Sequence, residues 1–524
     1  MMKNILKSLI KNDAYPEPTT KVDLIQTHAS WIFLTDCHAY KIKKPVDFGF
    51  LNFSTIDRRR FYCNEEIKYN RRLCPEIYEG VVEVVQTSDG AAFYGNGTVI
   101  DYAVKMKRLP SENMMDKLIS KKAVSSSDMH SITKIIAEFH LTTPTSPAIS
   151  VFGEADKILF NWKENIDQMT GFENKTLPAP DREFIRDWVF NFIENNSVVF
   201  SNRINNGYIK ECDGDIHLEN ICLVDDKVYI FDCIEFNERF RNCDTASDIA
   251  FLIMDLDFHN RHDLAEETLS LYQQLTGDKS LSDIIYFYMV YRAFVRGKVE
   301  SYRLIDKEIP LNEQSIIIDK ATQYFRLALG YIARQTLKPT LFITCGLMGS
   351  GKTTLAEQLA FELGISCFSS DRIRKTIAGI DHLTTVNDSF MDGLYAEKNN
   401  IATYNELIAL AENEIHLNHS LIIDASFTKL ETRLLFSNLA KKHSIQFVIL
   451  HVYCDENDNK RRLTERAMGP KSVSDGRIEL LLSQRSIFCE PVKNEGIIVK
   501  INTSNSLYSA LNNLYISFDN IDIK

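Results

Sequence analysis

Short apolar runs separated by polar turns dominate the first hundred residues. Trp31-Ile32-Phe33-Leu34 and Ala39-Tyr40-Lys41-Ile42 flank the polar stretch Thr35-Asp36-Cys37-His38, and this arrangement predicts a β-hairpin. Two further apolar runs, at residues 81–85 and 99–106, predict additional strands. The chain therefore begins with a strand-rich region.

A helix within this region is predicted from its end signals. Ser54-Thr55-Ile56-Asp57 places an acid three residues after a hydroxyl side chain, which is typical of a helix amino terminus. The helix is expected to extend to about Leu73, because Pro75 cannot continue it. The opening segment, residues 1–11, predicts another short amphipathic helix.

Helical patterns replace the strands farther along the chain. Residues 125–205 and 246–331 are expected to be mainly helical, and residues 208–232 to hold short strands around a polar loop. Strands followed by helices favour a two-lobed α+β domain.

The order of predicted strands and helices changes after residues 333–340. Short apolar runs at 341–345, 421–424 and 447–453 alternate with helical segments, which is the pattern of a parallel α/β sheet. We therefore predict two domains, residues 1–335 and 336–524. No internal repeat is evident.

Composition narrows the protein class. The 524 residues are 44% hydrophobic and 25% charged, an ordinary globular balance, and the net charge of −11 disfavours a general nucleic acid binder. The eleven cysteines contain no Cys-x-x-Cys pair, which argues against a disulfide framework or a zinc site. No stretch approaches the roughly 18 apolar residues that span a bilayer, so a cytoplasmic protein without a membrane partner is expected.

One motif carries specific chemistry. Residues 346–353, Gly-Leu-Met-Gly-Ser-Gly-Lys-Thr, fit the P-loop pattern between a predicted strand and a predicted helix at 354–363. Glycines allow backbone N–H groups to converge on phosphates, Lys352 would reach the β- and γ-phosphates of ATP, and Thr353 would hold Mg²⁺. The residues expected to bind nucleotide here are Gly346, Gly349, Ser350, Gly351, Lys352, Thr353 and Thr354.

Two acids follow predicted strands downstream of the P-loop. Asp371 would orient or deprotonate an acceptor hydroxyl, or it would cap the following helix. Asp424 would be a second Mg²⁺ partner, or an ordinary strand-end aspartate.

A basic cluster lies farther along the carboxy-terminal domain. Arg466 is the candidate lid arginine for the transferred phosphate, and Arg462 lies at the i, i+4 spacing that would let both face one way. A solvated helix face is the alternative reading. The cluster consists of Lys460, Arg461, Arg462, Arg466, Lys471, Arg477 and Arg485.

The P-loop, Ser370-Asp371-x-x-Arg374 and Asp424-Ala425-Ser426-Phe427 together resemble the P-loop kinase group that includes gluconate kinase, chloramphenicol phosphotransferase, zeta toxin and the kinase half of polynucleotide kinase. This resemblance covers about residues 340–500. It implies an α/β P-loop NTPase fold with a parallel sheet.

The amino-terminal half contains its own phosphotransfer pattern. Asp215 and Asn220 stand at Asp-x-x-x-x-Asn spacing, and the apolar run 228–231 leads into Asp232. Protein-kinase-like enzymes use this order, in which the first aspartate accepts the proton of the substrate hydroxyl. Asn220 and Asp232 would bind Mg²⁺.

The resemblance extends beyond this motif. Asp244-Thr245-Ala246-Ser247-Asp248-Ile249-Ala250 is similar to a segment of aminoglycoside phosphotransferases, and the whole chain resembles bacterial fusions of such a domain with a P-loop domain. The match is carried by 40–46, 70–73 and 231–236. It implies a bilobal, α+β protein-kinase-like domain before the P-loop domain.

By this resemblance, Lys41 contacts the ATP phosphates, with Lys43 as the alternative on the same face of the strand. Glu66 would be the helix partner, with Glu65 as second choice.

The sequence departs from the family pattern at two places. Asp213 replaces the histidine usual before Gly-Asp and is expected to raise the pKa of Asp215, and no clear glycine-rich loop precedes Lys41.

These motifs predict an ATP- and Mg²⁺-dependent phosphotransferase with two modules that act on hydroxyl groups of small molecules. Two alternatives remain open: a kinase for nucleic acid 5′-hydroxyls or nucleotide sugars, and an ATP-binding scaffold with a degenerate first module. The acceptor pockets are expected within 125–205, 250–330 and 375–415.

Overall fold

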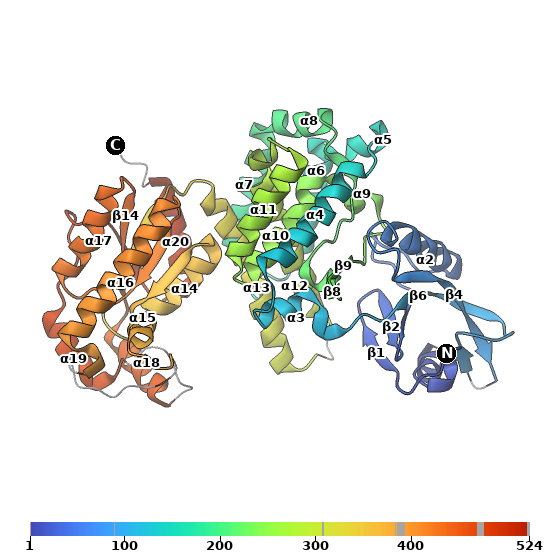
Figure 1. Cartoon of the computed structure of the whole chain (residues 1–524), viewed down its shortest axis with the longest axis horizontal. Coiled ribbons are helices and arrows are strands. Elements are labelled where there is room, and N and C mark those ends of the chain that lie inside the picture. Colours follow the sequence, from blue (N-terminus) through green and yellow to red (C-terminus); the bar gives the residue numbers. More distant parts are fainter. Residues whose placement is uncertain are drawn as a thin grey trace. The chain divides into compact units, whose positions relative to one another are not determined.

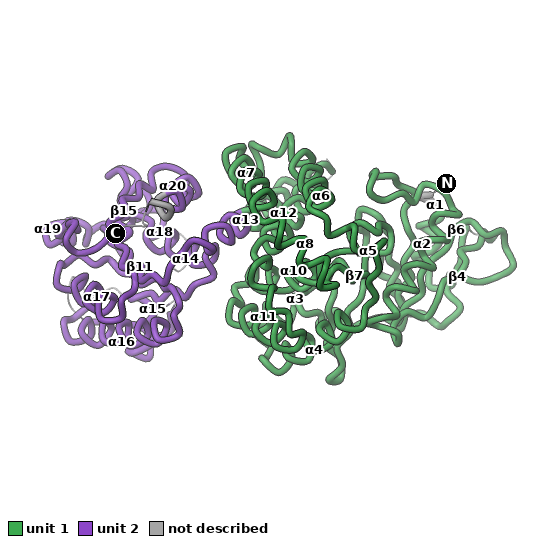
Figure 2. The backbone as a smooth tube through the Cα atoms, turned by 90° about the horizontal axis from the view of Figure 1, so that it is seen from above, with its two compact units in different colours: residues 1–325 green, residues 326–524 purple. Residues whose placement is uncertain are grey.

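A computed structural model describes residues 2–88, 90–306, 309–382, 384, 393–468 and 476–520, with side chains described between 5 and 516. The chain forms two compact units, residues 1–325 and 326–524 (Figure 2). The division falls within the long helix α13 (Leu311–Arg334). Each unit is built differently.

The first unit begins with an antiparallel sheet of six strands in the order β1-β2-β3-β6-β4-β5. Helix α2 (Ile56–Asn70) packs against β4 and β6, and the short helix α1 (Met2–Leu9) packs against β5 (Figure 1). The strands are β1 (Asp23–Gln26), β2 (Ser30–Leu34), β3 (His38–Lys43), β4 (Tyr78–Thr87), β5 (Gly90–Ala92) and β6 (Val99–Lys107).

Alternation along β3 gives this sheet a core face and a site face. Trp31 pairs with Ile42 and Phe33 pairs with Tyr40 across the predicted hairpin, and these four side chains belong to one buried cluster. Since neighbouring strand residues point to opposite faces, Lys41 and Lys43 lie on the other face from Tyr40 and Ile42. The hairpin prediction is confirmed.

Helix α2 supplies the other half of this site. The Thr55 hydroxyl accepts a hydrogen bond from the Arg58 N–H and caps the helix, one residue after the Ser54 that begins the predicted signal. The helix ends at Asn70, three residues before the predicted Leu73.

The second lobe of this unit is mostly helical, as predicted. Helix α10 packs against α12 and α11, and α11 packs against α4 (Figure 1). Two short antiparallel pairs, β7 with β10 and β8 with β9, carry the polar loop at their edge. The bounds are α3 (Met115–Ser120), α4 (Ser126–Thr142), α5 (Pro147–Ser150), α6 (Ala155–Gln168), α7 (Ala179–Asn195), α8 (Ser197–Asn205), β7 (Ile209–Glu211), β8 (Ile221–Val224), β9 (Lys227–Ile230), α9 (Glu238–Arg241), β10 (Asn242–Asp244), α10 (Thr245–Phe258), α11 (His262–Thr276) and α12 (Ile285–Arg303).

The second unit is an α/β domain around a parallel five-stranded sheet in the order β12-β13-β11-β14-β15. The strands are β11 (Thr340–Cys345), β12 (Ser366–Ser369), β13 (Leu421–Asp424), β14 (Gln446–Tyr453) and β15 (Ile497–Asn502). The first strand of the unit, β11, is central, and successive strands are added on both of its sides. In open α/β sheets such a reversal of strand order opens a ligand crevice at the carboxyl ends.

Helices cover both faces of this sheet (Figure 2). Leu407 of α16 and Phe436 of α17 join the buried side chains of β11 and β13 in one cluster. Helices α14 and α20 contact each other and the sheet. The helix bounds are α14 (Lys352–Leu363), α15 (Ser370–Ile377), α16 (Glu397–His416), α17 (Leu430–Lys442), α18 (Glu456–Met468), α19 (Ile478–Ile487) and α20 (Leu507–Asn520).

The predicted fold class, a bilobal α+β domain followed by a parallel-sheet α/β domain, is confirmed. β15 was not among the predicted strands, although it extends the sheet beyond β14. Within the described parts of the chain, no helix is both long enough and apolar enough to span a bilayer.

Candidate functional site

A buried network of charges joins the sheet, α2 and the helical lobe of the first unit. Glu66 is fully buried, and its two carboxylate oxygens lie 2.9 Å from Lys41 Nζ and 2.5 Å from Lys43 Nζ. Lys41 also pairs with Asp232, and Lys43 also pairs with Glu235. Both lysines that the sequence proposed for the phosphates therefore meet the same glutamate.

The charged groups of this network change one another's pKa values. Burial raises the pKa of Glu66, but the two lysines reverse this effect and hold the pKa at about 2. Burial lowers the pKa of Lys41, but the negative charges of Asp232, Glu66 and Glu235 together raise it well above its usual range. Glu65 instead pairs with Lys68 at 3.2 Å on the outer side of α2, so Glu66 occupies the position that the resemblance implies.

The polar loop between β7 and β8 brings the predicted residues Asp215 and Asn220 together. The Asn220 amide donates to Asp215 Oδ2 at 3.1 Å, and His217 Nε2 lies 3.6 Å from the same oxygen. Burial raises the pKa of Asp215, but the positive charges of His217 and Arg296 outweigh burial and lower it. An ionised carboxylate is the form that accepts a proton. Asp215 lines the cavity with Lys41 and Asp232, whereas Asn220 is buried behind it.

The expected effect of Asp213 on this base is wrong. Asp213 is buried, and burial raises its own pKa well above the usual range, an effect that the negative charge of Asp248 strengthens. This raised pKa favours the neutral form of Asp213. The pKa of Asp215 is lowered, not raised, because the positive charges of His217 and Arg296 outweigh burial.

Asp248 has a structural role that the sequence motif did not reveal. Its carboxylate accepts the backbone N–H groups of Asp213 and Gly214 at 3.0 and 2.9 Å, and His140 Nε2 lies 3.1 Å from it. Arg292 holds the same loop from the other side by donating to the Gly214 carbonyl at 2.9 Å. These contacts position the backbone on which Asp215 stands.

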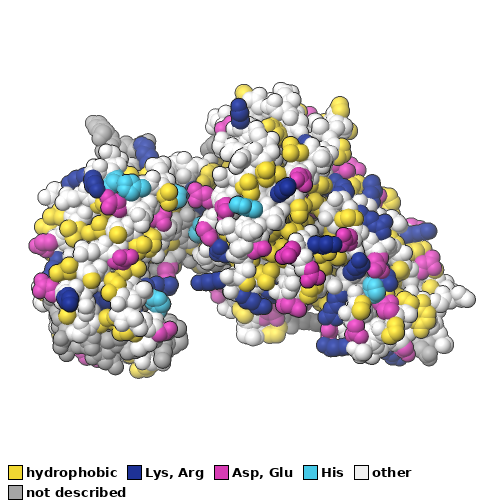
Figure 3. All heavy atoms as spheres, viewed as in Figure 1, with side chains coloured by type: hydrophobic (Ala, Val, Ile, Leu, Met, Phe, Trp, Pro, Cys, Tyr) yellow, Lys and Arg dark blue, Asp and Glu magenta, His cyan; other side chains and the backbone are white. Residues whose placement is uncertain are grey.

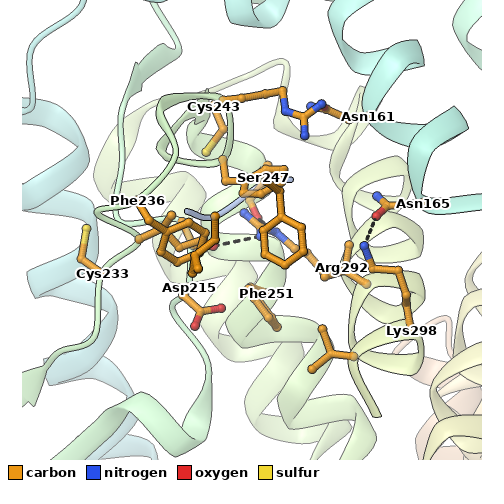
Figure 4. Close-up of a pocket in the computed structure, with 18 of the residues that line it drawn as sticks. Asn161, Asn165, Asp215, Cys233, Phe236, Cys243, Ser247, Phe251, Arg292 and Lys298 are labelled. Atoms are coloured by element: carbon orange, nitrogen blue, oxygen red, sulfur yellow. Dashed lines mark hydrogen bonds between the residues drawn. The ribbon is translucent and has the colours of Figure 1, made fainter. Parts of the chain in front are cut away.

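A cavity of about 410 Å³ opens between these elements. Thr27 and Ala29, from the turn between β1 and β2, line the cavity, and this turn contains no glycine. Helices α6 and α12 form the opposite side with polar and aromatic side chains (Figure 4). This side falls within two of the three regions in which acceptor pockets were expected.

The second unit builds its site on the P-loop after the central strand β11. All three glycines of this loop have positive φ, with 151° at Gly346, 77° at Gly349 and 87° at Gly351. At Gly346 a Cβ atom would lie 2.1 Å from the Val452 carbonyl oxygen, so only glycine fits there. Gly346 and Ser350 form the underside of the loop and do not line the cavity, while Gly349, Gly351 and Thr354 do.

Lys352, Thr353 and Asp424 meet at the mouth of this loop. Thr353 Oγ1 donates to Asp424 Oδ2 at 2.7 Å, and Lys352 Nζ donates to the Leu347 carbonyl at 2.7 Å. Burial lowers the pKa of Lys352 and raises that of Asp424. A hydroxyl and a carboxylate side by side offer the hard oxygen ligands that Mg²⁺ prefers, so these residues fit the expected ion.

Asp371 lines the same cavity. β12 ends at Ser369, which occupies the helix N-cap position, so Asp371 lies in the first turn of α15 and does not cap it. Its Oδ1 atom accepts a hydrogen bond from Arg374 Nη1 at 2.8 Å. Arg374 also reaches the Asn400 amide oxygen at 3.2 Å.

The basic cluster divides into residues that face the cavity and residues that do not. Arg466 and Arg477 line the cavity, which has a volume of about 570 Å³. Arg462 turns away and donates to Thr503 Oγ1 at 2.9 Å, so the expectation that it faces the same way as Arg466 is wrong. Lys460, Arg461 and Arg485 pair with exposed acids, and Lys471 lies outside the described residues.

Comparison with known proteins finds a family model within the second unit. Residues 341–491 match the family model of an AAA domain, so one matched segment contains the P-loop, Asp371, Asp424 and Arg466. Uncharacterized proteins of Mycobacterium bovis and Mycobacterium tuberculosis are 28% identical over 418 residues, which cover 79% of this chain and 80% of theirs.

Solved structures similar to parts of the chain include several kinases. A gluconokinase from Sinorhizobium meliloti is 17% identical over 35% of this chain and 93% of that one, with a TM-score of 0.25. A choline/ethanolamine kinase family protein from Mesorhizobium loti is 13% identical over 63% of this chain and 95% of that one, with a TM-score of 0.37. The APS kinase of Mycobacterium tuberculosis, solved with AMPPNP and APS, is 16% identical over 35% of this chain and 98% of that one, with a TM-score of 0.26.

Proposed function

We propose that the protein is a cytoplasmic phosphotransferase with two ATP- and Mg²⁺-dependent modules that act on hydroxyl groups of small molecules. One observation carries this proposal: in each unit, a lysine for the phosphates, a carboxylate for the metal and a second carboxylate for the acceptor hydroxyl border a single cavity. The three roles come from segments far apart in the sequence.

In the second unit, the P-loop amides and Lys352 would hold the phosphates, and Thr353 and Asp424 would hold Mg²⁺. The ion would supply charge neutralisation between the β- and γ-phosphates when bound. Asp371 faces the acceptor side and would take the proton of the attacking hydroxyl, whose oxygen forms a bond to the γ-phosphorus as the bond to ADP breaks. Arg466 would stabilise the charge of the transferred group.

In the first unit, Lys41 would hold the α- and β-phosphates while Glu66 keeps its amine in place. Asp232 and Asn220 fit the metal-binding role because they offer a carboxylate and an amide oxygen beside Asp215. Asp215 would accept the proton of the acceptor hydroxyl.

The surface favours a small acceptor over a nucleic acid. On the face shown in Figure 3, Lys and Arg side chains are interspersed with Asp and Glu side chains. Nucleic acid binders gather basic side chains on one face or groove. The net charge of −11 also opposes an extended polyanion.

The test is Mg²⁺-ATP turnover by the full chain with sugars, aminoglycosides, nucleosides and 5′-hydroxyl oligonucleotides. We expect Asp215→Ala to lower transfer by the first module about 10²- to 10⁴-fold with nucleotide affinity retained. Lys352→Ala should lower transfer by the second module about 10²-fold or more.

Exposed residues provide matched controls for both substitutions. Asp263→Ala and Lys398→Ala should leave turnover unchanged, since both side chains lie outside the two cavities. Intact ATP binding without transfer to any acceptor would contradict the proposal and favour a nucleotide-gated scaffold.

A further inference from the structure

The acceptor side of the first cavity contains a lysine whose direct partners are two neutral amides. Lys298 of α12 lines the cavity and donates to Asn165 Oδ1 at 2.5 Å and to Gln168 Oε1 at 2.7 Å (Figure 4). Among the described residues, no acidic oxygen lies within ion-pair distance of its amine. An ammonium group has three donors, so two neutral amide bonds leave one N–H for a ligand.

The carboxylates of the cavity are, in contrast, already engaged. Glu164 pairs with Arg239 at 2.7 Å, and Glu235 pairs with Lys43. Asp244 pairs with the buried Arg203 at 2.5 Å. The remaining two carboxylates that line the cavity are Asp215 and Asp232, which have roles in the proposed transfer. A polycationic acceptor such as an aminoglycoside would therefore find no unpaired carboxylate beyond the reacting groups.

A second cation in the wall has the same character. Arg292 is 5% exposed and donates to the Gly214 and Ser247 carbonyls at 2.9 Å, without a carboxylate within ion-pair distance in the described part of the chain. Partly buried charges are costly unless an opposite charge accompanies them. Lys298 and Arg292 thus place two positive charges on the acceptor side of the cavity, neither of them directly paired with a carboxylate of the described residues.

Helix α6 adds hydrogen-bonding groups to this side. Asn161, Asn165 and Gln168 all line the cavity, at a spacing that places them along one face of the helix. The Asn161 amide oxygen is buried and has no hydrogen-bond partner among the described residues. An acceptor-only atom in a cavity wall suits a hydroxyl donor on a ligand.

We propose that the acceptor of the first unit is a small hydroxylated anion, whose carboxylate or phosphate group pairs with Lys298 while another hydroxyl approaches Asp215. Asn161 would accept a hydrogen bond from a further hydroxyl. This inference rests on the proposed function, because Asp215 defines which hydroxyl reacts. Burial lowers the pKa of Lys298 to about 8, with the nearby positive charge of Arg239 acting in the same direction and Glu164 opposing it, so a bound anion would favour the charged form.

The test measures binding by calorimetry, in the presence of Mg²⁺ and a non-hydrolysable ATP analogue, with the full chain carrying Lys352→Ala. The carboxylate arm contains glycerate, gluconate and shikimate, and the phosphate arm contains glycerol 3-phosphate and glucose 6-phosphate. Glycerol, glucose and methyl shikimate are the neutral counterparts, and kanamycin is the cation. We expect an anion from one arm to bind about tenfold or more tightly than its neutral counterpart.

The substitution Lys298→Met keeps the length of the side chain and removes its charge. It should weaken that anion about 10- to 100-fold, and Lys298→Arg should restore most of the affinity. Lys163→Met is the matched control, because Lys163 is an exposed residue of α6 outside the cavity. Unchanged thermal unfolding of the variants would show that they are folded.

Several results would overturn the inference: no anion of the panel binds, the neutral counterpart or kanamycin binds as tightly, or Lys298→Met binds the anion as the parent does. Its failure is distinct from failure of the proposed function. Transfer to a neutral acceptor that depends on Asp215 would keep the function and refute the anion. Lys298-dependent anion binding without any transfer would support the anion site and refute the proposed function.

Discussion

Replacing Glu66 with glutamine removes one buried charge at nearly constant volume. Each carboxylate oxygen faces one lysine, at 2.9 Å for Lys41 and 2.5 Å for Lys43. The pKa of Glu66 falls from an ordinary 4.5 to about 2. A difference of about 2.5 at 1.36 kcal/mol for each pH unit corresponds to about 3 kcal/mol of folding stability.

The sign of the pH dependence follows from the direction of this change. Because the pKa is lower in the folded state, the contribution is fully present above pH 4.5 and is lost as the pH falls toward 2. Glu66→Gln should therefore reduce the free energy of unfolding by about 3 kcal/mol at pH 7. This difference should shrink as the pH falls below 4.5. The pairs of Lys41 with Asp232 and of Lys43 with Glu235 remain, so we expect the variant to fold.

Tryptophan fluorescence during urea unfolding measures this effect in the first unit alone, since Trp31, Trp162 and Trp188 all lie there. Glu65→Gln is the matched control. Its side chain is partly exposed and pairs with Lys68 at 3.2 Å, so the substitution should cost less than about 1 kcal/mol. A difference below about 1 kcal/mol for Glu66→Gln at pH 7, or one that is as large at about pH 3 as at pH 7, would refute this account of the network.

Three further outcomes follow from the two sites. Gly346→Ala should abolish calorimetric ATP binding by the second unit, because the new Cβ would lie 2.1 Å from a β14 carbonyl; unchanged binding would show that the loop is held differently. Asp424→Asn should raise the Mg²⁺ concentration needed for half-maximal turnover about tenfold while the unit stays folded, and an unchanged Mg²⁺ titration would remove Asp424 from the metal site. Anion affinity of the first unit should fall about tenfold for each pH unit above 8, as Lys298 between Glu164 and Arg239 loses its proton, whereas Lys298→Arg should give a flat profile.

The parts of the site that were predictable are local in sequence. The P-loop joins an apolar strand to a helix over a few residues, so its pattern already contains its geometry. The alternation of β3 likewise placed Lys41 and Lys43 on one face before the structure showed that both reach Glu66. In both cases the backbone period, 2 for strands and 3.6 for helices, determines the direction of the side chains.

The contacts that were not predicted, or were predicted wrongly, join segments that are distant in the sequence. Glu235 pairs with Lys43 across 192 positions, and nothing near either residue indicates the other. The spacing of Arg462 and Arg466 places both on one helix face. Arg462 nevertheless donates a hydrogen bond to Thr503, which directly follows β15, and so turns away from the cavity. β15 itself was not predicted, so that partner had no place in the sequence argument.

The acceptor wall shows why specificity is the last property to emerge from a sequence. A polar stripe such as Asn161, Asn165 and Gln168 on a helix ordinarily indicates a face in water. Here Asn165 is only 5% exposed, because α12 brings Lys298 against the stripe. A partly buried row of amides around an amine whose direct partners are neutral stabilises little by itself, since burial of polar groups costs free energy. A ligand that supplies the missing charge and hydroxyl groups would offset this cost. We therefore expect the residues that the fold itself does not need to indicate the class of molecule that the cavity binds.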